Sequence, residues 1–243
     1  MATESAVATR HGGEIRPPSW LAQTAILLEK DLRIELRTGE VLVTSGFFGV
    51  LVVVLGSLAF YVGPDTRGQV AAGVIWLAVS FASVLALGRL WQREREDGAF
   101  EGVIDTGIAP SALFAGKALG LLAFLGLIEL VVEPLTFLLF SLEPADFALP
   151  LLAITLFATP GIAAAGTLFG AMTVRTRARD LVLAVVLLAL LAPDVLTAVA
   201  ATRELFGGAR LAELGDYFRL LGVFDVTFVA GGLGLLGLLL GDT

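Results

Sequence analysis

The sequence contains no cysteine, one histidine and two methionines. Without cysteine the chain cannot form a disulfide, use a thiolate nucleophile or bind a metal through cysteine sulfur. The histidine, His11, lies in a glycine-containing N-terminal tail, where we expect a solvated side chain and not a catalytic base or a metal ligand. The motif Gly-x-x-x-x-Gly-Lys-Ser/Thr is also missing, so the sequence lacks the P-loop with which many ATPases bind nucleotide.

Positive charge is scarce as well. The 16 basic residues are outnumbered by 23 acidic ones, and the net charge of −7 leaves no basic surface for nucleic acid. Apolar residues are abundant: 57% of the chain is hydrophobic and the mean hydropathy is +0.89, which exceeds ordinary usage in soluble domains. The composition therefore indicates a membrane protein.

Six apolar stretches, each of at least 18 residues, account for most of this hydrophobicity. A helix needs about 20 apolar residues to cross the hydrocarbon core, so the pattern predicts an all-α membrane protein with six transmembrane helices. The stretches are Val41–Val62, Val70–Leu87, Ala118–Leu142, Phe147–Val174, Leu181–Ala201 and Leu220–Leu240. The resulting division is a disordered tail over residues 1–18, an amphipathic interfacial helix over 19–40 and a single six-span domain over 41–243.

The basic residues predict the orientation of the spans. Most of them precede the first stretch or lie between the second and third and between the fourth and fifth stretches. Lys and Arg accumulate on the cytoplasmic side of membrane proteins, so we expect these segments and both chain ends to be cytoplasmic. The polar tail before Ser19 lacks the apolar core of a secretory signal, so we expect no cleaved signal peptide.

A helical period precedes the first span. Leu21, Ala25, Leu28, Leu32 and Leu36 recur at spacings of three and four, and most charged residues fall off that stripe. Ser19 is a suitable N-cap. Such a helix would lie in the membrane interface with its apolar stripe in the acyl boundary. The alternative is a soluble helix that packs on a partner.

The segment after the second span combines charge with apolar side chains. Trp91 is expected at headgroup level as an aromatic anchor. Asp97-Gly98 is a turn signal, and Phe100, Val103 and Ile104 follow with helical spacing. This segment is either an ordinary solvated loop or a short helix that docks a cytoplasmic partner, because its apolar side chains require burial.

The same segment carries a family resemblance. Arg89-Leu90-Trp91 is followed, after five residues, by Asp97-Gly98 and then Glu101, while Gly73-Val74-Ile75-Trp76 lies in the second span. From about Leu28 to the C-terminus the chain resembles the heme exporter protein B family (CcmB). Further matching positions are Lys117, Gly126, Pro134-Leu135, Thr159-Pro160 and Pro193.

The resemblance implies an ABC-2-like permease subunit of a complex for cytochrome c maturation in the bacterial cytoplasmic membrane. It implies a CcmA-like subunit that hydrolyses ATP, CcmC-like and CcmD-like membrane proteins, the heme chaperone CcmE and a homodimer of this chain. The chain itself would be no enzyme. It implies that the residues that couple the permease to the ATPase are Arg89, Trp91, Asp97, Gly98, Phe100, Glu101, Val103 and Ile104.

No axial ligand set for heme iron accompanies the resemblance, since the methionines are Met1 and Met172 and the only histidine is His11. We therefore expect no cofactor bound directly by this chain, and any heme contact through apolar surface and propionates only. Two other functions stay open. The chain could be the permease of an exporter for another substrate, or a non-conducting scaffold that couples an ATPase to its neighbours.

Three acidic residues fall inside the predicted spans: Glu129, Glu133 and Asp194. Such residues face protein or water because a charge in hydrocarbon is costly. Glu129 and Glu133, one helical turn apart, either line a polar path or form hydrogen bonds that line the bundle, or they brace Pro134. Asp194 either pairs with Arg203 or caps a helix broken at Pro193.

Two features predict how the spans bend and pack. Helix kinks are expected at Pro134, Pro160 and Pro193. Gly166-x-x-x-Gly170 is typical of close packing between helices, here within the subunit.

Overall fold

The computed structural model describes residues 18–60, 63–95, 102, 105–174 and 180–241, and the regular structure within them is helical. The predicted disordered tail, residues 1–18, therefore lies almost wholly outside the described residues. Within these ranges, seven α-helices and a short 3-10 helix, Leu211–Leu214, follow one another. The α-helices are α1 (Trp20–Thr38), α2 (Glu40–Ala59), α3 (Pro64–Arg95), α5 (Pro110–Phe140), α6 (Pro144–Val174), α7 (Asp180–Phe206) and α8 (Gly215–Gly241).

Six of these helices, α2, α3 and α5 to α8, are long and apolar enough to cross a membrane. Each contains most of one of the six apolar stretches. The all-α, six-span prediction is thus confirmed. The helices extend beyond the apolar runs where charged or polar residues continue them, most clearly in α3, which ends only at Arg95.

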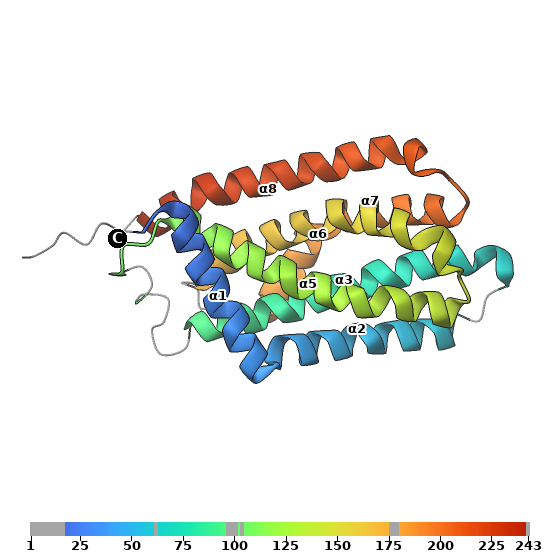
Figure 1. The fold of residues 1–243 in the computed structure, drawn as a ribbon, viewed down its shortest axis with the longest axis horizontal. Helices are drawn as coiled ribbons and strands as arrows, with labels where there is room; N and C mark the ends of the chain where they lie inside the picture. Colours follow the sequence, from blue (N-terminus) through green and yellow to red (C-terminus); the bar gives the residue numbers. More distant parts are fainter. Residues whose placement is uncertain (1–17, 61–62, 96–101, 103–104, 175–179, 242–243) are drawn as a thin grey trace, which may run out of the picture.

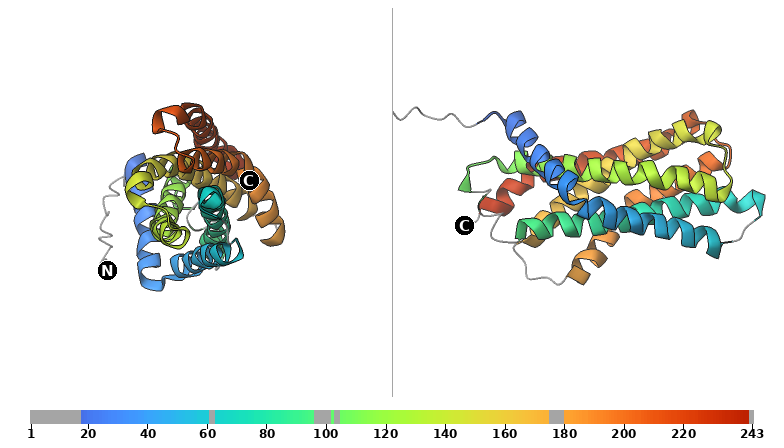
Figure 2. Two further views of the ribbon diagram at one scale, coloured as in Figure 1. Left: turned by 90° about the vertical axis from the view of Figure 1, so that its right-hand side faces the viewer. Right: turned by 60° about the horizontal axis from the view of Figure 1, so that its bottom comes forward.

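The six long helices lie side by side along the long axis of the molecule, and α1 crosses one end of them at an angle (Figures 1 and 2). Helix α3 packs against α2, α5, α6 and α7, and it is the most buried span. Helix α8 lies at the periphery on α5, α6 and α7 and is the least buried. Because the chain crosses an even number of times, α8 ends near the end of the bundle where α1 lies.

The boundaries of α1 have local causes. Ser19 is the predicted N-cap, and its hydroxyl accepts a hydrogen bond from the Ala22 N–H at 3.4 Å. Gly39 ends the helix with a φ of 63°, a left-handed conformation that glycine adopts without steric cost. Its N–H donates to the Glu35 carbonyl at 2.7 Å. Glu40 begins α2 immediately afterwards, so Gly39 is the corner between the crossing helix and the first span.

Candidate functional site at the α1 end of the bundle

Helix α1 turns a polar face toward the bundle. Its buried residues are Gln23, Thr24, Leu27, Asp31 and Glu35. The two ends of the predicted apolar stripe lie outward, where Leu21 and Leu36 are 72% and 86% exposed, whereas Leu28 and Leu32 in its middle are half-buried. Polar contacts and the buried Leu27 hold the helix to the spans, and its place in the membrane interface stays a prediction.

Lys117 is the centre of the first polar cluster. It belongs to α5 and is fully buried. Its Nζ lies 2.8 Å from Asp31 Oδ2 on α1 and also binds Glu94 Oε1 on α3. The same Glu94 oxygen accepts a hydrogen bond from Lys30 at 2.6 Å. The two lysines and the two acids come from three helices, and their charges sum to zero. Buried charges are stable only when they are paired in this way.

Lys30 is the exposed member of this cluster. Burial lowers the pKa of its ammonium group, but the hydrogen bond to Glu94 and the negative charges of Asp31 and Glu94 outweigh that effect. The pKa of Lys30 therefore lies above its ordinary value of 10.5. Lys30 keeps its charge throughout the physiological range.

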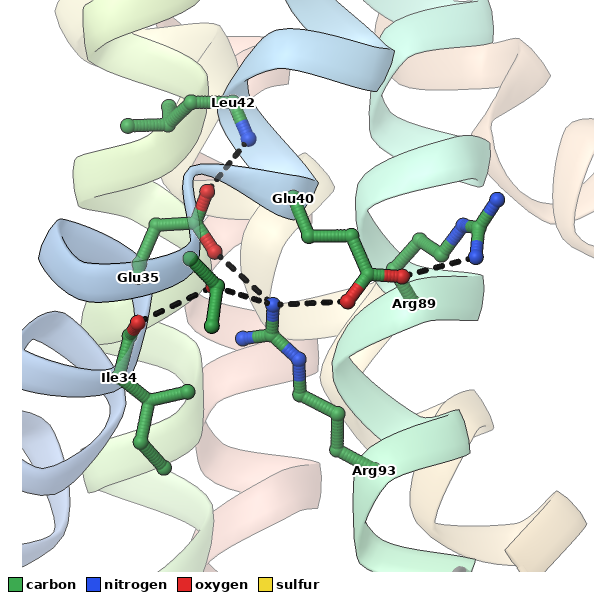
Figure 3. A network of polar contacts seen from close by, with 7 residues as sticks. Ile34, Glu35, Glu40, Leu42, Arg89 and Arg93 are labelled. Atoms are coloured by element: carbon green, nitrogen blue, oxygen red, sulfur yellow. Dashed lines mark hydrogen bonds and ion pairs between the residues drawn. The ribbon is translucent and has the colours of Figure 1, made fainter.

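A second polar cluster joins the α1–α2 corner to α3 (Figure 3). Arg93 Nη2 lies 3.2 Å from Glu35 Oε2 and 3.3 Å from Glu40 Oε2. Arg89 donates to the other oxygen of Glu40 at 2.8 Å. The remaining oxygen of Glu35 accepts the backbone N–H of Leu42 at 2.8 Å, in the first turn of α2. These contacts satisfy an unpaired N–H at a helix start and hold the corner against α3.

The first residues of α1 bind the chain where it enters α5. Gln23 Oε1 accepts the backbone N–H of Ala109 at 2.8 Å, and the Trp20 indole donates to Ser111 Oγ at 3.0 Å. Asp31, further along α1, shares Lys117 with Glu94 at the end of α3. Helix α1 therefore holds both flanks of the segment between Arg95 and Ala109.

That segment contains most of the residues predicted to couple the permease to an ATPase. Asp97, Gly98, Phe100, Glu101, Val103 and Ile104 lie outside the described residues, so their proposed role stays a prediction. Arg89 and Trp91 are described. Arg89 is partly exposed and binds Glu40 as stated above.

Trp91 is not the headgroup anchor that was predicted. It is 1% exposed, inside the bundle. The reason is Gly170 on α6, where an added Cβ would lie 2.2 Å from Trp91 Nε1, so that only glycine admits the indole. Lys117 Nζ lies 6.0 Å from the centre of the ring, a cation–π distance. The predicted close packing at Gly166-x-x-x-Gly170 thus includes a tryptophan–glycine contact within the subunit.

Glu129 and Glu133 connect α5 to α6. Thr159 donates to Glu129 Oε1 at 2.6 Å, and Thr155 donates to Glu133 Oε1 at 2.7 Å. These hydrogen bonds join two spans, which agrees with the expected hydrogen bonds that line the bundle. A cavity of about 250 Å³ lies beside them, mostly apolar in its lining.

The three prolines predicted to kink helices lie inside helices that continue past them. Pro134 is in α5, Pro160 in α6 and Pro193 in α7. The predicted capping role of Asp194 is therefore wrong, because α7 is unbroken at Pro193 and offers no helix end to cap. Pairing with Arg203 is wrong too, since Arg203 donates to Gln69 at 3.3 Å and neither Asp194 oxygen has a hydrogen-bond partner among the described residues.

Sequence reasoning missed the acids that hold α1. Asp31 and Glu35 are one turn apart on a side adjacent to the leucine stripe, which was a usable signal for a second functional face. Lys117 was noted only as a family position. Its place at the start of an apolar run, with no acid nearby in sequence, indicates a partner on another helix. The described residues contain no group of three or more potential metal ligands.

Comparison with known proteins agrees with this architecture. The model of the family described as CcmB protein matches residues 22–232. A protein of Bradyrhizobium diazoefficiens named heme exporter protein B is 32% identical over 185 residues, which cover 75% of this chain and 82% of that protein. Proteins of the same name from Rhodobacter capsulatus and Haemophilus influenzae are 31% and 26% identical, covering 70% and 78% of this chain and 78% and 87% of their own lengths. The match includes α1, the spans and the polar clusters between them, and the chain belongs to the CcmB protein family.

Proposed function

We propose that this chain is the permease subunit of an ABC-type heme exporter complex that acts in cytochrome c maturation. Its place is the bacterial cytoplasmic membrane, with both chain ends in the cytoplasm. A separate CcmA-like subunit binds and hydrolyses ATP, and CcmC-like, CcmD-like and CcmE-like proteins complete the assembly around two copies of this chain. The names of the relatives and the distribution of basic residues support this proposal.

The observation that carries the proposal is that α1 holds both flanks of the segment 96–108. Gln23 binds Ala109 at one flank, and Asp31 shares Lys117 with Glu94 at the other. An ATPase that docks on this segment would pull on α3 and α5 together, since buried ion pairs do not stretch without a large cost. Release of the heme-loaded chaperone then follows from movement of the spans.

Heme, in this proposal, meets the chain through apolar surface and through its propionates. The methionine side chains are Met1 and Met172, the one histidine is His11 and cysteine is absent, so we expect the axial ligands to come from a partner. ATP likewise belongs to the partner subunit, because the sequence has no P-loop.

The docking step is tested by co-purification with the ATPase from native membranes. Phe100→Asp removes an apolar contact and Glu101→Lys reverses a charge, so each should reduce the recovered ATPase at least several-fold. Glu143→Lys, a charge reversal at an exposed position at the other end of the bundle, is the matched control and should leave recovery unchanged. Full recovery of ATPase with both segment variants would refute docking at this segment.

Two further functions are separated by a second measurement. Reconstituted complex in vesicles can be supplied with ATP, heme and the chaperone. Chaperone release or heme transfer that requires ATP supports the proposal. ATP-driven flux of a different substrate would make the chain another kind of exporter. ATP-dependent chaperone release without any transfer across the vesicle would make it a coupling scaffold.

A further inference from the structure

Two aspartates on neighbouring helices, Asp194 on α7 and Asp225 on α8, lie inside the membrane-spanning bundle. Asp194 on α7 is 1% exposed, and neither of its oxygens has a hydrogen-bond partner among the described residues. Asp225 on α8 interacts with it electrostatically and is half-buried. Asp225 also lies on the backbone of α6, where a Cβ added to Gly161 would be 2.5 Å from Asp225 Oδ1.

Both residues are close to the middle of their spans. Asp194 lies twelve residues before the end of α7 and Asp225 ten residues after the start of α8, or about 18 Å and 15 Å along the helices. The hydrocarbon core is about 30 Å thick, so each carboxyl lies within the apolar part of its span and not at a helix end.

Among the described residues, the spans packed against the pair place no basic side chain at its level. Helix α3 has no ionisable residue between Gln69 and Gly88, and α6 has none after Asp146. Helix α5 contributes Glu129 and Glu133, acids bound to threonines of α6, whereas its Lys117 lies near the start of the helix and binds Asp31 and Glu94. The described part of these spans therefore places only neutral or acidic side chains near the pair.

The nearest basic residues of the two helices are already engaged. Arg203 is nine residues beyond Asp194, about 14 Å along α7, and donates to Gln69. Arg219 is six residues before Asp225, about 9 Å along α8, and binds Asp216 at 2.8 Å. Neither arginine can neutralise the pair from its position.

We propose that Asp194 and Asp225 form a proton-binding pair inside the membrane. Two carboxylates without a cation cost far more at this depth than one neutral acid beside one carboxylate. Asp194, the more buried residue, holds the proton. Asp225, half-buried at the surface of the bundle, exchanges it by the balanced step –COO⁻ + H₃O⁺ → –COOH + H₂O. Loss of the proton places two negative charges between α7 and α8, beside the α6 backbone at Gly161, and so favours separation of α8.

Infrared spectroscopy of the purified protein in lipid tests the pair. The carbonyl band of protonated carboxylic acids should be present in the wild-type protein near neutral pH, and part of it should be lost in Asp194→Asn. Asp216→Asn, an exposed aspartate on the same helix as Asp225, should leave the band unchanged. Identical protonated-acid bands in wild type and Asp194→Asn would overturn the proposal, because Asp194 would then be ionised.

A hydrophobic carbodiimide supplies an independent readout. N,N′-dicyclohexylcarbodiimide reacts with protonated carboxyls from the lipid phase, so mass spectrometry should find an adduct on Asp225 that increases as pH falls. The adduct should be absent at Asp216. No adduct at Asp225 at any pH at which the protein stays folded would count against exchange at that residue.

A metal cation is the competing occupant. Thermal stability should be the same in sodium, potassium and choline chloride at equal ionic strength. Stabilisation by sodium or potassium that disappears in Asp194→Asn would replace the proton by a metal ion and reject the proposal. None of these measurements involves heme or an ATPase, so the result is independent of the proposed function.

Discussion

Lys117 on α5 and Asp31 on α1 form a fully buried ion pair, with Nζ 2.8 Å from Oδ2, across 86 residues of sequence. Glu94 on α3 completes the contact from a third helix. The pair ties the crossing helix to the spans at the flanks of the proposed docking segment. The free energy of this ion pair should therefore affect the stability of this end of the bundle. It should also affect how a movement of the docking segment reaches the spans.

Removal of Lys117 should destabilise the protein strongly. Lys117→Met leaves Asp31 and Glu94 buried without their main cation, and such a loss costs about 3–5 kcal/mol. Thermal unfolding of the purified protein should show a markedly lower midpoint. Arg33→Met, which breaks the exposed Arg33–Glu29 pair, is the control and should cost less than about 0.5 kcal/mol.

The same variant offers a rescue experiment. Addition of Asp31→Asn and Glu94→Gln to Lys117→Met removes the uncompensated charges and should recover much of the lost stability. A triple variant as unstable as Lys117→Met would show that packing of the lysine chain, and not charge balance, is what matters.

Lys30 should make stability depend on alkaline pH. Its pKa is raised in the folded state, so its contribution is complete below the ordinary value of 10.5 and is lost as the pH rises through the folded-state value. Unfolding midpoints should therefore fall above about pH 10.5, and less so in Lys30→Met. Parallel profiles for the two proteins would contradict a contribution from this residue.

Gly170 should not tolerate a side chain. Gly170→Ala places a methyl group 2.2 Å from Trp91 Nε1, so the helices must move apart, at a cost of about 1–3 kcal/mol. Gly126→Ala, on α5 where an added Cβ meets nothing within 4 Å, should be neutral or slightly stabilising. Denaturation in detergent compares the two. Equal stability of both variants would mean that α3 and α6 are not closely packed at Trp91.

The hydrogen bonds between α6 threonines and α5 glutamates should stabilise the fold whether or not the glutamates are charged. Thr159→Val removes the donor to Glu129, and hydrogen bonds between membrane helices average about 0.6 kcal/mol, with a maximum of about 1.7 kcal/mol. Glu129→Gln keeps an oxygen that accepts from Thr159, so the folded state should persist, whereas Glu129→Leu should lower the unfolding midpoint. If the Gln variant folds normally but fails in cytochrome maturation, the acid has a role beyond packing.

Orientation is testable because the chain has no native cysteine. Single cysteines at Ser5, Ala99 and Thr176 should react with an impermeant maleimide only from the cytoplasmic side. Cysteines at Thr66, Glu143 and Arg210, which are exposed at the other end of the bundle, should react only from outside. Cytoplasmic labelling at Arg210 alone would show that the last two spans are wrongly oriented.

The number of spans was predictable because each crossing is an uninterrupted apolar run, and length alone then sets the helix. The start of α1 was predictable for a similar reason, since Ser19 is followed at once by a helical period. Local chemistry determines both features, so one sequence is sufficient to find them.

The contacts of the site were less accessible to sequence reasoning. A period of 3.6 residues marks the apolar side of α1 but does not show which side contacts protein, and here Asp31 and Glu35 face the spans while Leu21 and Leu36 are exposed. Trp91 was interpreted as an anchor because tryptophan is enriched at membrane interfaces. Its burial depends on the space left by Gly170, 79 positions later on another helix. No residue near Trp91 in sequence indicates that space.

The ion pair of Lys117 also has a consequence for biogenesis. The chain is synthesised from its N-terminus, so Asp31 and Glu94 are made before Lys117, the cation that binds both of them. Until α5 emerges, Glu94 has only Lys30 as a partner in this cluster, and the end of α3 cannot reach its final burial. A chain that ends before Lys117 would therefore lack the contact that fixes α1 to the spans.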